Sequence, residues 1–194
     1  AALSAPVIFV THDFDEAALV ADRLCLLDRG EVLQTGAPRE VLLRPASAQA
    51  ARLLDMKNLF AGKVISHDGD RTLIDWNGHR LVCERDDRFV PGTPITWSIP
   101  GTHVLVSQAD ASRLGDIQNQ IPARISRLVP LSESVSATVI VQGASEAILS
   151  LTLPERFARR TSLGPGTDVV VALMPDGIHL MPAEGDGLPA SRQK

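Results

Sequence analysis

His12 is the residue whose position most clearly predicts chemistry. It follows a short apolar run, Val7 to Val10, which predicts a buried strand of a parallel sheet. The residues after it take helical spacing, and Asp13, Asp15 and Glu16 crowd the first turn, where the helix dipole favours them. Sheets of the α/β type place ligands at the C-terminal ends of their strands. His12 therefore has two interpretations: it contacts a reacting phosphate, or it makes a structural hydrogen bond at the end of a strand. A Thr-His-Asp motif without further context favours the structural interpretation.

Other residues that carry chemistry are scattered along the chain. The remaining histidines show no metal-ligand spacing with each other or with cysteine, and no Gly-x-Ser-x-Gly elbow occurs; these histidines are His67, His79, His103 and His179. The two cysteines, Cys25 and Cys83, lie in apolar runs far apart in sequence. They predict buried free thiols in a reducing compartment, and a disulfide between them stays an open alternative.

Composition narrows the class of partner. The 194 residues carry 19 basic and 23 acidic side chains, interspersed, for a net charge of −4, and aromatic content is 4%. Proteins that bind nucleic acid use clusters of positive charge and aromatic side chains that stack on bases. The sequence has no basic block and few aromatic residues, so no nucleic-acid partner is predicted. No apolar run reaches the roughly 18–20 residues that span a bilayer, and no signal peptide is apparent. We expect a cytoplasmic protein.

Residues 1–56 predict an α/β segment. After the first strand and helix come a hairpin with its turn at Arg29-Gly30, a helix opened by Pro38, and a further short helix within residues 46–56. Only one parallel strand is offered, and such a strand needs neighbours. The segment therefore predicts the edge of an α/β domain and not a whole one.

The rest of the chain predicts an all-β tandem repeat. Pro-Gly-Thr recurs at Pro91–Thr93 and Pro165–Thr167, each time followed by alternating apolar residues. "AGKVIS" from Ala61 aligns loosely with "PARISR" from Pro122, and Asn77-Gly78 predicts a hairpin. We expect one barrel repeat at 57–108, a linker at 109–118, a second repeat at 119–182 and a tail at 183–194. About five short strands per copy can close on themselves as an OB-like barrel; two unrelated β regions sharing a turn are the alternative.

The order of short motifs in residues 6–56 resembles the C-terminal end of the nucleotide-binding domain of ABC importers. Thr-His-Asp, Glu-Ala, Ala-Asp-Arg, Gly-Glu-Val, Gly-x-Pro, Glu-Val and Arg-Pro appear in the family's order. The repeat region resembles the tandem β-barrel regulatory domain, of the TOBE or MOP-like type, in importers of molybdate, sulfate, iron, polyamines and some sugars. "IQNQIPARI", from Ile117, looks most like the molybdate importers.

The resemblance implies several roles. The implied fold class is the α/β end of a P-loop NTPase domain followed by OB-like barrels. The implied role of His12 is that of the switch-loop residue, which contacts the γ-phosphate of ATP. ATP and Mg²⁺ would belong to the intact parent, an ABC-type transport ATPase at the inner membrane with a permease partner and a homodimeric arrangement. The Gly-x-x-x-x-Gly-Lys-[Ser/Thr] loop, the acidic strand and the Leu-Ser-Gly-Gly signature do not occur. We therefore expect a fragment that neither binds nor hydrolyses ATP unaided and needs no cofactor.

Molybdate-binding barrels, as the resemblance implies, carry Ser-Ala-Arg-Asn before the second opening strand and a lysine near the last one. This chain has Asp116-Ile117-Gln118-Asn119 and Met174 there. Two cations are lost and a carboxylate is gained, which opposes an anion. The candidate ligand residues are Gln118, Asn119, Ser126, Ser132 and Ser134, and we expect oxyanion binding by the barrel to be weak or absent. A stand-alone oxyanion-binding or small-ligand-binding barrel is the alternative function.

Overall fold

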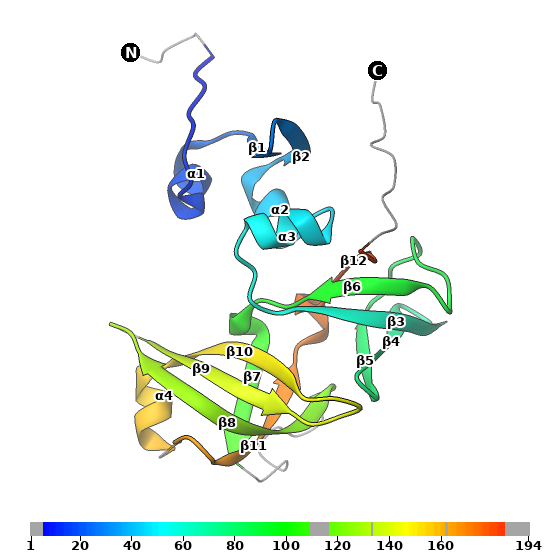
Figure 1. The fold of residues 1–194 in the computed structure, drawn as a ribbon, viewed down its shortest axis with the longest axis vertical. Helices are drawn as coiled ribbons and strands as arrows, with labels where there is room; N and C mark the ends of the chain where they lie inside the picture. Colours follow the sequence, from blue (N-terminus) through cyan, green and yellow to red (C-terminus); the bar gives the residue numbers. More distant parts are fainter. Residues whose placement is uncertain (1–5, 109–116, 133, 162, 185–194) are drawn as a thin grey trace. The chain divides into compact units, whose positions relative to one another are not determined.

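The structure is a computed structural model, which describes residues 6–108, 117–132, 134–161 and 163–184 (Figure 1). It divides into two compact units, residues 1–54 and residues 55–194. Residues 109–116 of the linker predicted at 109–118, and almost all of the predicted tail, lie outside the described residues.

The first unit contains the helices and hairpin that the sequence predicts. Its elements are α1 (Phe14–Val20), β1 (Leu24–Asp28), β2 (Glu31–Gly36), α2 (Pro38–Leu43) and α3 (Ala48–Leu53). β1 and β2 pair antiparallel around Arg29 and Gly30, whose φ angles of 50° and 85° suit a tight turn. Pro38 begins α2, and the Ser47 side chain caps α3 by accepting from the Ala50 N–H. A small core of Leu26, Val41 and Ala50 holds these elements together.

The predicted first strand, Val7 to Val10, is not a strand in the structure. All four residues are exposed, Ile8 at 91% and Val10 at 90%. A parallel strand satisfies its backbone groups only by pairing with neighbouring strands. The β1–β2 hairpin is the only sheet among the described residues of the first unit, and this apolar segment pairs with no strand there.

The second unit contains the predicted tandem repeat as two five-stranded sheets. The first repeat runs β3 (Leu59–Asp68), β4 (Arg71–Trp76), β5 (His79–Glu84), β6 (Pro94–Ser98) and β7 (Val104–Gln108). The second runs β8 (Gln120–Pro130), β9 (Ser134–Val141), β10 (Ala147–Pro154), β11 (Asp168–Leu173) and β12 (His179–Pro182), with α4 (Glu155–Arg160) inserted after β10.

Both predicted turn signals are confirmed. Asn77 and Gly78 join β4 to β5 with φ angles of 56° and 84°, as a type I′ turn requires. In each Pro-Gly-Thr turn the glycine N–H returns to the opening strand: Gly92 donates to Val64 O at 2.8 Å, and Gly166 to Ile125 O at 2.7 Å. The two repeats therefore share one fold, down to a bulge in each opening strand.

The expectation that each repeat closes on itself is wrong. The sheet orders are β12-β6-β3-β4-β5 and β10-β9-β8-β11-β7, so the last strand of each repeat lies in the other repeat's sheet (Figure 1). β7 pairs with β11, and β12 pairs with β6. The 3₁₀ turns Gly101–His103 and Pro175–Gly177 lead into these exchanged strands. Because one continuous core joins both sheets, the two repeats form a single packing unit.

Candidate functional site

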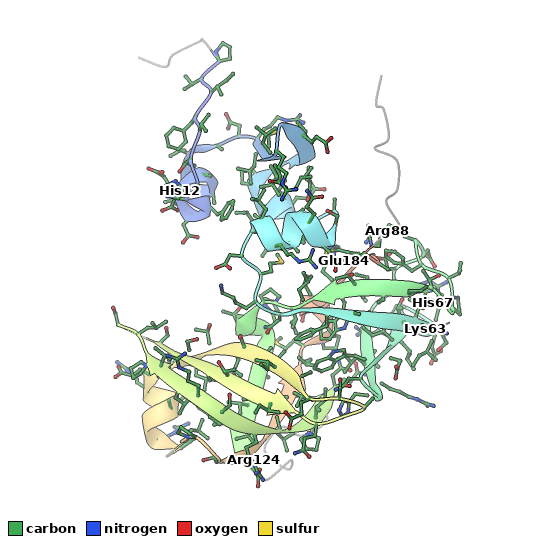
Figure 2. All side chains as sticks on the ribbon, viewed as in Figure 1. His12, Lys63, His67, Arg88, Arg124 and Glu184 are labelled. Carbon is green, nitrogen blue, oxygen red and sulfur yellow. The ribbon has the colours of Figure 1, made fainter. Side chains whose placement is uncertain are left out.

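His12 lies in the loop that leads into α1 (Figure 2). Its side chain is exposed, while its neighbours organise the helix start. The Asp13 carboxylate accepts from the Glu16 N–H at 3.0 Å, and the Thr11 hydroxyl donates to the Glu16 carboxylate at 3.1 Å. Around His12 the described first turn supplies carboxylates. These carboxylates do not fit a triphosphate, so a nucleotide site here would need positively charged groups or N–H donors from elsewhere.

Asn119 of the predicted ligand set is occupied by the fold itself. Its Nδ2 donates to Val82 O at 2.8 Å and to Leu173 O at 2.9 Å, and its Oδ1 accepts from the Val82 N–H at 2.7 Å. Val82 belongs to β5, the edge strand of the first sheet, whereas Leu173 ends β11 of the second. The amide thus joins the two sheets as a peptide group would, and its hydrogen-bonding groups are not left for an anion.

The other predicted ligand residues do not converge on Asn119. Gln118 is exposed beside it. Ser126 lies in the bulge halfway along β8, and its hydroxyl donates to Thr138 O at 3.0 Å. Ser132 and Ser134 lie in the turn after β8 and at the start of β9. A strand rises about 3.3 Å per residue, so this turn lies roughly 30 Å or more from Asn119, too far for one small oxyanion. Asp116 lies outside the described residues.

Asn58 is the residue that sequence reasoning missed. It is 2% exposed, and its Nδ2 donates to Ile99 O at 3.0 Å and Ser150 O at 2.6 Å. Its Oδ1 accepts from the Ser150 N–H at 2.7 Å. Ser150 lies on β10, the edge strand of the second sheet. Asn58 therefore repeats the Asn119 contacts with the two sheets interchanged, and we call these two residues the paired asparagine clamps. Extending the alignment of "AGKVIS" with "PARISR" by three residues toward the N-terminus would have matched them.

A second polar network links the exchanged strand β12 to the first repeat; Figure 2 labels two of its members, His67 and Arg88. His67 on β3 donates from Nε2 to Phe89 O at 2.9 Å and accepts at Nδ1 from the Thr72 hydroxyl at 3.0 Å, a tautomer assigned from the carbonyl acceptor. The Thr72 oxygen accepts from the Asp86 N–H. The Arg88 guanidinium donates to both carboxylate oxygens of Asp86, and it also donates to Leu180 O of β12 at 3.1 Å. Burial alone would raise the pKa of Asp86, but the hydrogen bonds from Arg88 outweigh burial and lower it.

Metal-binding groups and thiols are the remaining candidates for chemistry among the described residues. Within the described part of the chain, no group of three or more histidine, cysteine, aspartate or glutamate residues could hold a metal ion. Both cysteines are free, as predicted, but Cys25 is exposed and only Cys83 is buried. Burial, with nearby carboxylates adding to it, raises the pKa of the Cys83 thiol to about 12, so this thiol is a poor nucleophile. No helix in the described ranges has both the length and the apolar character to cross a bilayer.

The second unit is a mostly β structure with an OB-like or MOP-like fold. A solved structure of the cytoplasmic molybdate-binding protein ModG, with molybdate bound, shares this fold at a TM-score of 0.56. The match covers 66% of this chain and 96% of that one at 15% sequence identity, which supports the likeness of fold alone. No protein-family model matches the chain.

The homologues of this chain are ATP-binding proteins of ABC importers, which confirms the resemblance seen in the sequence. The spermidine/putrescine import ATP-binding protein PotA of Marinobacter nauticus is 29% identical over 187 residues, 94% of this chain and 48% of that protein. The Fe(3+) ions import ATP-binding protein FbpC of Agrobacterium fabrum is 42% identical over 67 residues, 34% of this chain and 19% of that protein. The chain spans about half the length of relatives such as the first.

Proposed function

We propose that this chain is the C-terminal regulatory and dimerising region of the ATP-binding subunit of an ABC importer. The observation that carries the proposal is the match to an importer ATP-binding protein over 94% of the chain, across both units. The exposed apolar segment from Val7 to Val10 supports it, because such a segment needs a sheet to enter. In the intact subunit, His12 would contact the γ-phosphate of ATP bound with Mg²⁺.

The partners proposed for the intact subunit are a second copy of itself and a membrane permease, at the cytoplasmic face of the inner membrane. Dimerisation is proposed through residues 58–182. Light scattering on the purified chain over a wide concentration range checks the self-association. A particle that stays monomeric at high concentration would contradict the dimer proposal while leaving the importer proposal to the test below.

The transported substrate is proposed as molybdate or a related oxyanion, on the strength of the molybdate-like "IQNQIPARI" segment. The names of the relatives keep polyamine and iron(III) as alternative substrates, beside sulfate. Whichever substrate is transported, the proposed role of the barrels is to space and dimerise the subunits and not to sense an anion. The side chain of Asn119 supports this role, because its hydrogen-bonding groups are used within the fold.

The coding sequence upstream of Ala1 tests the importer proposal directly. We expect an in-frame Gly-x-x-x-x-Gly-Lys-[Ser/Thr] loop and a Leu-Ser-Gly-Gly signature, in that order. Their presence, together with ATP hydrolysis by the longer product, would support the proposal. An in-frame stop codon close upstream would instead favour the second candidate.

That second candidate is a stand-alone barrel protein that binds an oxyanion or another small ligand. The fold likeness to ModG over 96% of that protein favours it. Calorimetric titration of the purified chain with molybdate, tungstate, sulfate and spermidine distinguishes the two. Micromolar binding of molybdate that survives moderate salt would favour the stand-alone function.

A further inference from the structure

Two equivalent hairpin turns of the second unit, one between β4 and β5 and one between β9 and β10, contact each other across the repeats. Asn77, in the turn between β4 and β5, donates from Nδ2 to Ser145 O at 2.5 Å. Its Oδ1 accepts from the Ser145 N–H at 2.7 Å and from the Ser145 hydroxyl at 3.1 Å. Its backbone carbonyl accepts from the Ala144 N–H at 2.9 Å. One asparagine therefore fastens the turn of the first repeat to the turn before β10.

The residue after Asn77 makes this contact chemically fragile. Gly78 is exposed and has no side chain to shield its backbone nitrogen. Among the three asparagines of the sequence, at 58, 77 and 119, only Asn77 precedes a glycine. Asparagine is a thermolabile residue, and an unhindered neighbouring backbone nitrogen is the usual nucleophile in its breakdown.

We propose that Asn77 is a site of spontaneous deamidation, and that docking of the two turns sets the rate of the reaction. The Gly78 nitrogen loses its proton and attacks Cγ of Asn77, forming a C–N bond and a five-membered imide. The bond from Cγ to Nδ2 breaks, and the nitrogen takes up a proton and leaves as ammonia. Water then adds to one of the two imide carbonyls and opens the ring to aspartate or isoaspartate. No oxidant or reductant takes part.

The docked geometry holds the reacting group still. Ser145 engages both ends of the Asn77 amide, so Cγ cannot turn toward the Gly78 nitrogen while the three side-chain contacts persist. The reaction proceeds from the undocked state, in which the amide is free. The rate of conversion therefore reports how often the two repeats separate at this point.

The product restores only part of the contact, because a carboxylate can still accept from the Ser145 N–H and hydroxyl but can no longer donate. A carboxylate at position 77 has no N–H to give to Ser145 O, and it places a charged oxygen against that carbonyl. In the isoaspartate product the backbone passes through the side chain, which displaces the carbonyl that accepts from Ala144. Deamidation thus weakens the contact between the hairpin turns, and the change is irreversible.

Two glycines offer a matched pair of variants. A Cβ at Gly143 would overlap the Asn77 carbonyl oxygen and lie 2.6 Å from its Nδ2, so Gly143→Ala forces the turns apart. A Cβ at Gly164 would meet nothing within 4 Å, so Gly164→Ala controls for substitution of a loop glycine. The purified wild-type chain and both variants are incubated in mildly alkaline buffer. Peptide mapping by mass spectrometry follows conversion at position 77, with the Asn58 and Asn119 peptides as internal references.

We expect Gly143→Ala to convert about tenfold faster than the wild type, which corresponds to about 1.4 kcal/mol of lost docking, and Gly164→Ala to match the wild type. Equal rates in Gly143→Ala and the wild type would overturn the proposal. A comparison that needs no variant guards against misfolding of Gly143→Ala: the wild-type chain unfolded in urea should convert Asn77 faster than the folded chain. An unfolded chain that converts no faster than the folded one would also overturn the proposal.

Discussion

Replacing Asn58 by alanine removes one of the paired asparagine clamps from a buried position. The change deletes three side-chain hydrogen bonds, to Ile99 O, Ser150 O and the Ser150 N–H. A typical hydrogen bond contributes about 0.5–1.5 kcal/mol net, and each buried group left without a partner costs about 1–3 kcal/mol. Some of the freed groups regain water, so we expect the free energy of unfolding to fall by about 3–5 kcal/mol. The corresponding fall in Tm is roughly 10–20 °C.

The assay is urea unfolding followed by tryptophan fluorescence, because Trp76 and Trp97 are buried in the second unit. The equivalent change in the other clamp, Asn119→Ala, should act in the same direction. Gln118→Ala removes an exposed amide at the neighbouring position and should stay within about 0.5 kcal/mol of the wild type. A loss below about 1 kcal/mol for Asn58→Ala would refute the reasoning, since it would mean that the sheet edges hold without the clamp.

Three further predictions concern reactivity, pH and ligands. Exposed Cys25 should react promptly with a thiol reagent, whereas buried Cys83 should react only on unfolding. Equal reaction rates of the two thiols in the folded chain would contradict the burial of Cys83. The lowered pKa of Asp86 stabilises the fold above the ordinary carboxylate range, so stability should fall as pH drops through and below it, and Asp86→Asn should flatten that acid limb of the stability curve. Nucleotide with magnesium should give no thermal shift of the purified chain, because His12 is the only residue of the predicted ATP site present; a clear shift would contradict the expected fragment.

The local structure of this protein follows closely from short sequence signals. Pro38 and Ser47 begin helices, and Asn77-Gly78 and the Pro-Gly-Thr turns reverse the chain where the pattern predicts. These signals act over a few residues, through restricted φ angles and caps, so they hold in almost any tertiary setting. The hydrophobic alternation likewise places the buried faces of most strands.

The segment from Val7 to Val10 marks where this reasoning fails. Its composition predicts a buried strand, yet a strand exists only through hydrogen bonds to neighbours that local sequence does not specify. The candidate ligand residues fail for a related reason. Asn119 and Ser134 are close enough in sequence to be predicted as ligands of one site. The extended strand β8 lies between them and separates them by roughly the whole length of that strand.

The sequence alone indicates two similar β repeats and the family that they resemble, and it predicts an α/β segment before them. That β7 and β12 change sheets, and that Asn58 and Asn119 join the exchanged sheets, appears first in the folded structure. A strand that closes its own repeat and one that closes its neighbour have the same alternating pattern, because both bury one face in a similar core. The choice between them rests on contacts between residues far apart in the chain, such as Asn58 with Ser150, and no local pattern records those contacts.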